Sequence, residues 1–418
     1  MASASTTTLD AALKEYYLPP AREQLNNESL MLAQMERSTQ HVEGRRAVLS
    51  LHVSRNAGVG ARAEGGALPT AGYQGYVEER VTLAYNYLRI KVSGQAMKAT
   101  VNDSGSFVRA LSNEMTNGVN DLRRDVNRQI FNDSNDRIAQ LGTTSGATTI
   151  VLAADTSTNQ LALLEVGSKI DIGTATNPVL RAQNHFITSV DKTASPPTMT
   201  VSTTQGGSAA SLTTAATDFV TRAGSQTADG GGNIKHELTG LREIVAASGT
   251  LHNVNPTTYP VWKSTASSNS GTNRAATDNL FETVIDDIDT EAGKSPNFCV
   301  TSKGVRRNYA AQLKSMKRFN DGASITLKGG FKALTIDCGD VSLPIAADRD
   351  CPNNTAFLLN LNHITQHEMS DWEWADYDGA VLRNTSGYDQ WEAFMFKYHE
   401  LCTDQRNTHG IISDLTES

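Results

Sequence analysis

The chain has 418 residues, a formal net charge of −8 and only 20% charged residues. Hydrophobic residues make up 39%, which supplies enough apolar side chains for two or three domains with separate cores. The acidic balance argues against a protein whose main activity is gripping nucleic acid, because such a protein needs a basic face for phosphate contacts.

Residues 1–45 begin as a polar tail and then predict one helix. Pro19 and Pro20 mark its start, and the helix is expected over 21–43. Its apolar positions are sparse: Leu25, Leu30, Leu32, Met35 and Val42. Because so few apolar residues cannot form a core, we expect this segment to lie on another surface, with a second chain as one candidate.

Residues 46–95 predict an extended hairpin. Strand-like runs rich in β-branched and aromatic residues cover Ala47–Val53 and Val77–Val92. The segment 56–72 between them carries five glycines. Two strands joined by such a tip form an arm that reaches outward, and an isolated hairpin is only marginally stable in water. We therefore expect contacts with other subunits from Arg45, Arg46, Arg55, Arg62, Tyr73, Tyr76 and Arg80.

Residues 96–141 contain the most informative pattern, a long amphipathic helix over 102–132. Its apolar residues recur at three- and four-residue steps and share one stripe: Phe107, Leu111, Met115, Val119, Leu122, Val126 and Ile130. Asp103 and Ser104 are candidate N-caps, and Gly142 lies beyond the expected end. Such a helix is a rod of roughly 40 Å. On its other faces, we expect contacts with neighbouring subunits from Arg123, Arg124 and Arg128.

Residues 142–225 form an island rich in Thr, Ser, Gly and Ala. Short apolar runs separated by turns predict strands, as in a small antiparallel barrel or sandwich. The runs are 149–153, 161–166, 169–172, 185–190, 198–202 and 218–222. The shift in composition indicates an inserted antiparallel β-domain, and the glycines of 228–233 predict a flexible return to the main fold.

Helices and strands alternate from 226 to the end of the chain. A short helix is expected around 238–245, closed by Gly249, and a second over 280–288, capped at Thr277 or Asp278 and ended by Gly293. The remaining predicted elements are a strand at Asn297–Thr301, a helix at Lys303–Lys317, strands at Phe331–Ile336, Val341–Ile345 and Thr355–Leu361, a long strand at Trp391–Thr403 and a short one at Gly410–Ile412. The mixture predicts the α+β class.

Patterns for catalysis, cofactors and metals fail one by one. The truncated dinucleotide fingerprint from Gly58 to Ala63 is followed by Glu-Gly-Gly where a helix is needed. The acidic residues Asp371, Glu373, Asp376 and Asp378 lack the spacing of an EF-hand loop and indicate a solvated loop. No nucleophile elbow, phosphate loop or zinc-protease motif occurs. We therefore expect no enzyme activity, no cofactor and no metal.

The cysteines and the chain start bear on the compartment. Cys299, Cys338, Cys351 and Cys402 have no C-x-x-C spacing and no histidine at a zinc-like offset. We expect buried, inert thiols in a protein made in a reducing cytoplasm. The N-terminus carries no secretion signal, and no apolar run approaches the ~20 residues of a membrane span, so we expect no membrane association.

The order of these parts resembles the major capsid protein of tailed bacteriophages, the Hong Kong 97-type fold. The stretch from Gly240-Leu-Arg-Glu-Ile244 through Tyr259-Pro-Val-Trp-Lys263 is similar to the start of that family's axial domain. Three segments resemble its strand series: Gly330–Ile336, Leu343–Asp348 and Asn354–Leu361. Phe396–Cys402 ahead of His409–Ile412 resembles its returning strand. The resemblance covers nearly all of the chain except 142–225.

The resemblance implies a division of the chain and a structural function. The implied parts are an N-arm over 1–45, an extended loop over 46–95, a spine helix of the peripheral domain over 96–141, the inserted domain over 142–225, an axial domain with connecting strands over 226–390 and a returning peripheral strand over 391–418. Many copies would form hexamers and pentamers in an icosahedral shell that encloses the phage genome without sequence-specific DNA binding. The implied partners are other copies, a portal, scaffold or protease during assembly, and a decoration protein. The implied location is the virion, after assembly in the host cytoplasm.

Two alternatives remain open from the sequence. A β-rich phage tail or adhesin protein would use 142–225 as a binding module and would form rings or tubes. An unrecognised hydrolase would remain a small soluble oligomer.

Overall fold

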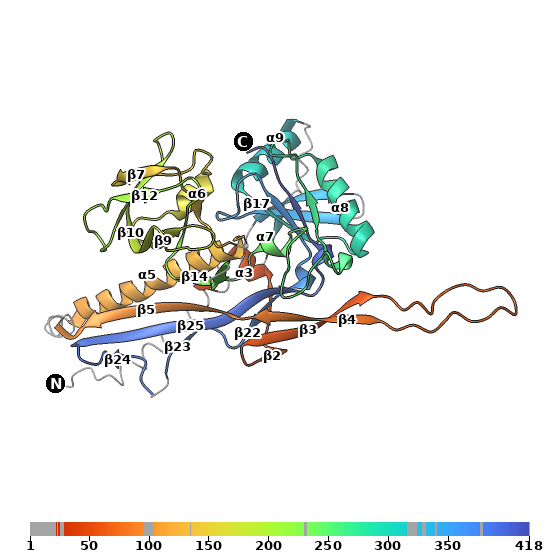
Figure 1. Cartoon of the computed structure of the whole chain (residues 1–418), viewed down its shortest axis with the longest axis horizontal. Coiled ribbons are helices and arrows are strands. Elements are labelled where there is room, and N and C mark those ends of the chain that lie inside the picture. The colour runs from red at the N-terminus through yellow and green to blue at the C-terminus, as the bar shows by residue number, and fades with distance from the viewer. Residues whose placement is uncertain are drawn as a thin grey trace.

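The protein is represented by a computed structural model that describes residues 22, 24–25, 29–95, 104–133, 135–229, 232–315, 324–327, 332–338, 341–376 and 379–417. A long helix lies along a ribbon of two long strands, two separate domains lie on the other side of that helix, and a hairpin projects far beyond the body (Figure 1). The architecture therefore mixes several sheets with few helices.

The predicted long helix is confirmed as α5, Ser104–Ile130, which has 27 residues. The described part of its apolar stripe is buried in the main core: Met115, Val119, Leu122, Val126 and Ile130. Asp103 and the side chains of Phe107 and Leu111 lie outside the described part of the chain. The helix packs closely on the ribbon, since a Cβ atom on Gly118 would come within 3.0 Å of the Leu88 side chain.

The ribbon is formed by β5, Ala84–Ser93, and the long predicted last strand β25, Gln390–Thr403, which pair antiparallel. The second run of the predicted hairpin is therefore split at Leu83. Its first half is β4, Gly75–Thr82, which pairs with β3, Arg46–Ser54, whereas its second half turns away to join β25. The same sheet also contains β22 at Ile364–Glu368, β23 at Glu373–Trp374 and β24 at Arg383–Asn384.

The helix predicted over 21–43 is confirmed only in part: residues 22, 24, 25 and 30–34 are helical, but the stretch from 36 onward is not. α3 spans only Leu30–Gln34, and the chain then extends as β1, Glu36–Ser38, and β2, Val42–Glu43. Parallel pairing of β1 with β22 supplies the backbone hydrogen bonds that a longer helix would have made. Tertiary pairing here overrides local helix propensity.

This N-terminal segment lies on its own chain. Leu25, Leu30, Leu32 and Met35 are buried in the same core as the α5 stripe. The candidate of a second chain as their support is therefore wrong. Residues 1–21 are outside the described residues.

The predicted β-rich region between α5 and residue 225 has its own core, formed by residues from Ile138 to Val220. Its main sheet has the order β6 (Ala139–Gln140), β13 (Phe219–Arg222), β9 (Lys169–Gly173), β10 (Ala182–Asp191), β11 (Thr198–Ser202) and β8 (Thr149–Val151). A second sheet pairs β12, Leu212–Thr214, with β7, Thr144–Ala147. We call residues 138–222 the insert.

One expectation in this region is wrong, and a second is qualified by the structure. The strand predicted over 161–166 is replaced by helix α6, Thr158–Leu163, because Ser157 and Gln160 form a reciprocal capping box at its start. The return over 228–233, predicted as flexible, has strands on both sides, since β14, Gln226–Asp229, pairs antiparallel with β15, Gly232–Lys235; Gly230 and Gly231 lie outside the described residues.

The second domain is built on a seven-stranded sheet of order β16 (Thr265–Ser267), β26 (Gly410–Ile412), β21 (Ala356–Leu359), β17 (Phe298–Thr301), β20 (Val341–Ala347), β19 (Lys332–Cys338) and β18 (Ser324–Thr326). Helices α8, Asp278–Ala292, and α9, Lys303–Ser315, share one apolar cluster with it. The predicted N-cap Thr277 and the left-handed Gly293 (φ 64°) bound α8. We call this unit the seven-stranded domain. The chain enters it past α7, Leu241–Ile244, and the short 3-10 helix Pro260–Trp262.

Candidate inter-subunit surface

The hairpin formed by β3 and β4 projects from the body and carries residues 55–74 as a strand-free tip (Figure 1). Four large apolar side chains along it are open to solvent: Val59 at 70%, Leu68 at 86%, Tyr73 at 85% and Tyr76 at 65% exposure. Exposing this much apolar area on a thin arm is costly in water. Exposed apolar side chains of this kind are typical of a surface that binds another protein.

The neck of the tip is closed by Asn56. Its side-chain amide donates to the Gly72 carbonyl at 3.0 Å, and its side-chain oxygen accepts from the Gly58 amide at 2.6 Å. Gly72 is required at this point, because a Cβ atom there would lie 2.8 Å from the Ala57 nitrogen. The loop is thus anchored at its base, and the residues beyond the neck reach outward.

The seven residues predicted as contacts in the hairpin region differ in availability. Six are exposed: Arg45, Arg55, Arg62, Tyr73, Tyr76 and Arg80. Arg62 donates to the carbonyls of Ala61 and Ala67 within the tip, at 2.9 and 3.1 Å. Arg80 is exposed and forms an ion pair with Glu78 at 2.9 Å, and Arg46 is half-buried. The structure brings Arg46 and Arg80 together at the base of the hairpin and leaves Arg55 and Arg62 near its tip.

Of the three predicted contact residues on α5, Arg128 is not available to another subunit. It is buried and donates two hydrogen bonds to Glu237, at 2.6 and 2.9 Å. It also pairs with Asp125, which accepts in turn from Arg222 of the insert at 3.1 Å. Burial alone would raise the pKa of Asp125, but Arg128 and Arg222 outweigh it and hold that pKa well below its usual range. The prediction for Arg128 is therefore wrong.

Arg123 and Arg124 remain nearer the surface. Arg124 is half-exposed and lies 3.8 Å from Glu165 of the insert. Arg123 is partly buried. Helical spacing alone could not separate these residues from Arg128, because the partner Glu237 lies far along the chain.

Two hydrogen bonds join the base of the hairpin to the body, and a third, within the body, holds His252 in place. The Arg80 amide donates to the His252 carbonyl at 3.1 Å, and the His252 ring donates from Nε2 to the Leu401 carbonyl at 3.0 Å. Glu79 is fully buried, and its carboxyl accepts from the Cys402 thiol at 3.6 Å. Burial raises the pKa of Glu79 to about 8 and lowers that of His252 to about 4, so burial favours the neutral form of both groups.

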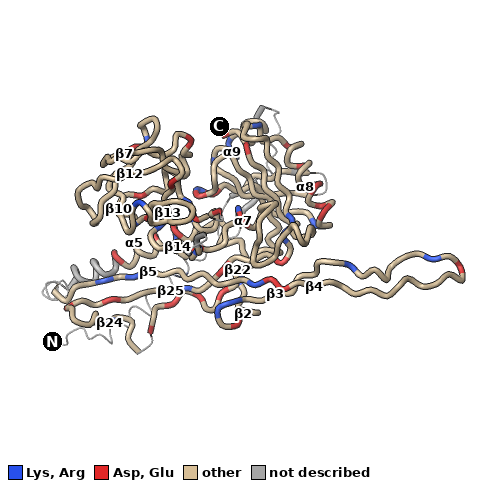
Figure 2. Tube along the Cα trace, in the orientation of Figure 1, with Lys and Arg blue, Asp and Glu red and all other residues tan. Residues whose placement is uncertain are grey.

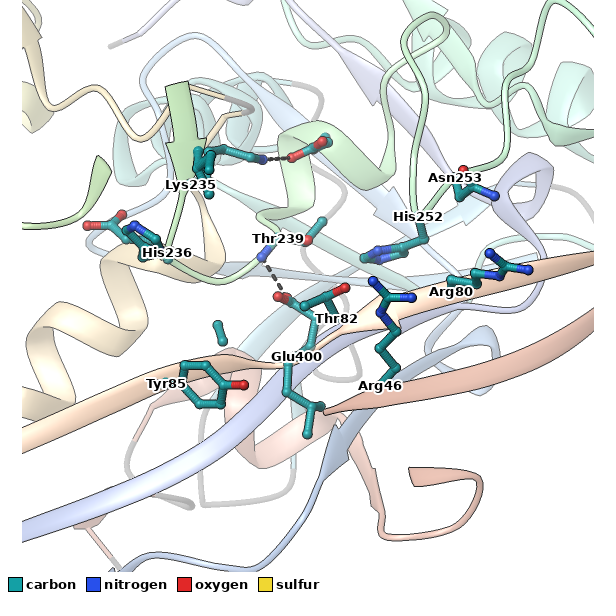
Figure 3. Close-up of a pocket in the computed structure, with 15 residues that line it drawn as sticks. Arg46, Arg80, Thr82, Tyr85, Lys235, His236, Thr239, His252, Asn253 and Glu400 are labelled. Carbon is teal, nitrogen blue, oxygen red and sulfur yellow. Dashed lines mark hydrogen bonds and ion pairs between the residues drawn. The ribbon is translucent and has the colours of Figure 1, made fainter. Parts of the chain in front are cut away.

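A cavity of about 560 Å³ lies beside this base. Figure 3 shows Arg46 and Arg80 at one wall, His252 between them and the facing loop, and Lys235 paired with Glu243 on the far side. Glu400 closes the floor and accepts from the Thr239 amide at 2.6 Å (Figure 3). Burial raises the pKa of Glu400 to about 8. Residues of both the hairpin and the ribbon line the cavity. The lining residues include no catalytic pair of a nucleophile and a base.

The acidic segment near residue 371 is only in part the solvated loop that the sequence predicted, since Asp376 is exposed whereas Asp371 and Glu373 are half-buried. Asp371 lies 3.6 Å from Lys397 and 3.8 Å from Arg22, and the neighbouring Trp372 is buried. The cation partners come from segments far away in sequence, which is why the local pattern suggested solvent exposure. Asp378 lies outside the described residues.

The cysteines are free and buried, as predicted. Within the part of the chain that the structure describes, no cluster of three or more His, Cys, Asp or Glu side chains could hold a metal ion. No helix among the described residues is long and apolar enough to cross a membrane.

Comparisons with family models and with curated proteins give no match. Among solved structures, a chain of the cyanophage A-1(L) capsid asymmetric unit matches with a TM-score of 0.52 and 12% identity, over 94% of both chains. The holo-SrpI encapsulin complex from Synechococcus elongatus PCC 7942 gives 0.45 and 9%, over 93% of this chain and 88% of that one. A structure from Mycobacterium phage Adephagia gives 0.42 and 10%, over 100% of both. The cyanophage match, the one of these three with a TM-score above 0.5, shows that the chain shares the fold of a chain of that phage capsid.

Proposed function

We propose that this chain is the major capsid protein of a tailed double-stranded DNA phage. Many copies assemble as hexamers and pentamers into an icosahedral shell around the genome. The single observation that carries the proposal is the match to the cyanophage capsid chain over 94% of both chains, which includes nearly every part of the molecule. The exposed apolar side chains of the projecting hairpin support it independently, because they need a second subunit to cover them.

The proposal assigns the parts of the Hong Kong 97-type fold to this chain. The N-arm is 1–45, although its segment from Leu25 to Met35 belongs to the core of its own subunit. The extended loop is 46–82. We assign β5 to the peripheral domain instead, because it pairs with β25 and shares a core with α5. The insert elaborates the peripheral domain, and the seven-stranded domain is the axial domain.

The inter-subunit contacts follow from exposure. The proposed contact residues are Arg45, Arg46, Arg55, Arg62, Tyr73, Tyr76, Arg80, Arg123 and Arg124. Arg128 is left out, because it is buried inside its own chain. We place no sequence-specific DNA contact on this surface, in keeping with the net charge of −8.

The proposed role is structural rather than enzymatic. Assembly would take place in the host cytoplasm and deliver the protein into the virion. A portal, a scaffold or protease, and a decoration protein are the partners that such assembly calls for.

Negative-stain microscopy of the purified full-length chain tests the proposal. Closed, angular shells built from sixfold and fivefold rings are the expected product. Open tubes or stacked rings would favour a tail protein instead, and a small oligomer with no higher assembly would refute the capsid role.

A further inference from the structure

Helix α8 of the seven-stranded domain presents one strongly acidic face. Its fifteen residues include six acids and no lysine or arginine. The apolar residues Phe281, Val284, Ile285 and Ile288 are buried against the sheet. The opposite side is exposed and carries Glu282, Asp286, Asp287, Asp289 and Glu291.

The placement of these acids works against the helix itself. Glu282 and Asp286 are four residues apart, as are Asp287 and Glu291, and like charges at that spacing repel. Asp289 and Glu291 occupy the last turn, where the helix dipole is negative and a cation would be favourable. Neither Asp286 nor Asp287 forms an ion pair with another described residue. Helix stability therefore does not account for this face.

Helix α9 shows the opposite arrangement. Its sequence contains Lys303, Arg306, Arg307 and Lys314 and no acid. Three of these cations lie within its first five residues, at the positive end of the dipole, where acids would be favourable. Lys303 and Arg306 form no ion pair with any residue that the structure describes.

The two helices lie on one face of the sheet but border different sides of the domain. Phe281 of α8 and Tyr309 of α9 meet edge-to-face at 6.0 Å, and the Tyr309 hydroxyl donates to Asp278 at the start of α8 at 2.7 Å. The rest of α8 runs down the right-hand margin of the domain, whereas α9 lies at its top (Figure 1). Figure 2 shows acidic positions, coloured red, along the margin formed by α8, and basic positions, coloured blue, beside α9. The last turn of α8 thus lies apart from the basic start of α9 in the same chain.

We propose that the acidic face of α8 docks on the basic start of α9 in a second copy of this chain. The contact pairs carboxylates with cations and sets the negative end of one helix dipole beside the positive end of the other. Because it joins two different surfaces of the same domain, it repeats head-to-tail and closes a ring when the rotation between copies permits. The inference rests on the proposed function and deepens it, since it names the faces that join neighbouring copies within a ring.

Charge reversal tests the pairing on the full-length protein. D286K/D287K reverses the acidic face, K303E/R306E reverses the basic one, and a fourfold variant carries both changes. Each twofold variant should lower the yield of rings and shells at least tenfold at about 0.1 M salt, where charges still interact over about 10 Å. The fourfold variant should recover a yield within about threefold of the unchanged protein, because the swapped faces are complementary again. D155K/D191K changes two exposed acids of the insert by the same net charge and should assemble normally.

A second measurement stands apart from assembly yield. D287C/R306C should form a ladder of disulfide-linked multimers under mild oxidation, since the native thiols are buried, and each single-cysteine variant should give at most a dimer. Normal assembly by both twofold variants, or equal failure of the fourfold variant, would overturn the pairing while leaving the capsid proposal intact. Nucleic-acid binding lost in K303E/R306E with assembly unchanged would assign α9 to another partner. If the unchanged protein forms no rings or shells, the proposed function itself fails.

Discussion

The hairpin tip and the insert both extend away from the body of the protein, but they are stabilised in opposite ways. The insert buries a cluster of its own that includes Ile150, Ile172, Met199 and Val201. The tip over 55–74 buries no large apolar residue at all. Both are rich in small residues, so composition alone does not separate them.

The difference shows what an apolar residue needs in order to build a core. In the insert, the chain reverses direction repeatedly and its strands pair with one another, so that each apolar side chain contacts several others. In the hairpin, only two strands run side by side, and beyond Ser54 and Gly75 even that pairing ends. An element of the second kind gains its stability from another surface. The predictions below test this contrast.

The largest expected effect is the loss of shells when the tip is removed. Deleting 56–72 joins Arg55 to Tyr73 and leaves the β3–β4 pairing in place. The monomer should stay folded, with a free energy of unfolding within about 0.5 kcal/mol of the unchanged protein, because the deleted residues contact little of the body. Electron microscopy should show no closed shells.

Two controls sharpen that experiment. A Gly-Ser segment of equal length in place of 56–72 keeps the reach but removes the side chains, and it should also fail to close shells. A deletion variant that is unfolded by circular dichroism would mean that the tip belongs to its own subunit's core.

The next effect concerns the buried ion pair between α5 and Glu237. Arg128→Met leaves the buried Glu237 without its cationic partner, so the free energy of unfolding should fall by about 3–5 kcal/mol. The matched change Arg124→Met on the same helix removes a half-exposed ion pair and should cost less than about 1 kcal/mol. Chemical denaturation of both variants measures the two values. Equal losses would show that the buried network contributes nothing special.

The core of the insert should behave as an independent unit. Ile172→Ala removes a fully buried side chain and should cost about 2–5 kcal/mol, while Val166→Ala, which is 66% exposed, should change stability by no more than about 0.5 kcal/mol. Calorimetry should show the transition of the insert moving to lower temperature while that of the seven-stranded domain stays in place. A single shared transition that shifts as a whole would contradict the separation.

The smallest effect is a pH dependence at the hairpin base. Glu79 has a pKa of about 8 in the folded chain against an ordinary value of 4.5, so the folded state keeps a proton that the unfolded state releases between these values. The free energy of unfolding therefore falls as pH rises through this window, by about 1.4 kcal/mol per pH unit from this group. Glu79→Gln should remove that contribution and make the denaturation midpoint less dependent on pH between about 5.5 and 7.5. Glu400→Gln, which changes a buried carboxyl on β25, serves as the comparison.

A Glu79→Gln variant with an unchanged pH slope would contradict the assignment. The groups around Glu79 are Cys402, Asp404 and Arg406, all from the end of β25 and the turn after it. The variant leaves them in place, so the difference in slope reports on Glu79.

Elements with a strong local pattern could be predicted from the sequence. The α5 stripe and the α8 helix, with its cap at Thr277 and its stop at Gly293, carry their signals within the segment itself. The strands β1 and β23 have three and two residues, and they form because distant strands pair with them. The N-terminal helix was overpredicted for the same reason, since nothing near Glu36 announces the pairing with β22.

The residues of the candidate surface divide in the same way: local sequence predicts some of their environments and not others. The exposure of Arg55, Arg62, Tyr73 and Tyr76 could be predicted, because their segment has too few apolar residues to form a core. Burial of Arg128 depends on Glu237, and the anchoring of Asp371 depends on Lys397 and Arg22. Such long-range ion pairs have no signature in local spacing, so only the three-dimensional structure reveals them.

The central claim is that contacts with a neighbouring copy of the chain stabilise the hairpin. A cryo-electron microscopy reconstruction of particles assembled from the full-length chain tests it most directly. The account predicts closed shells in which residues 55–74 lie across an adjacent subunit and cover Leu68 and Tyr73. Residues 55–74 folded back on their own subunit, or left uncovered in solvent between subunits, would contradict it.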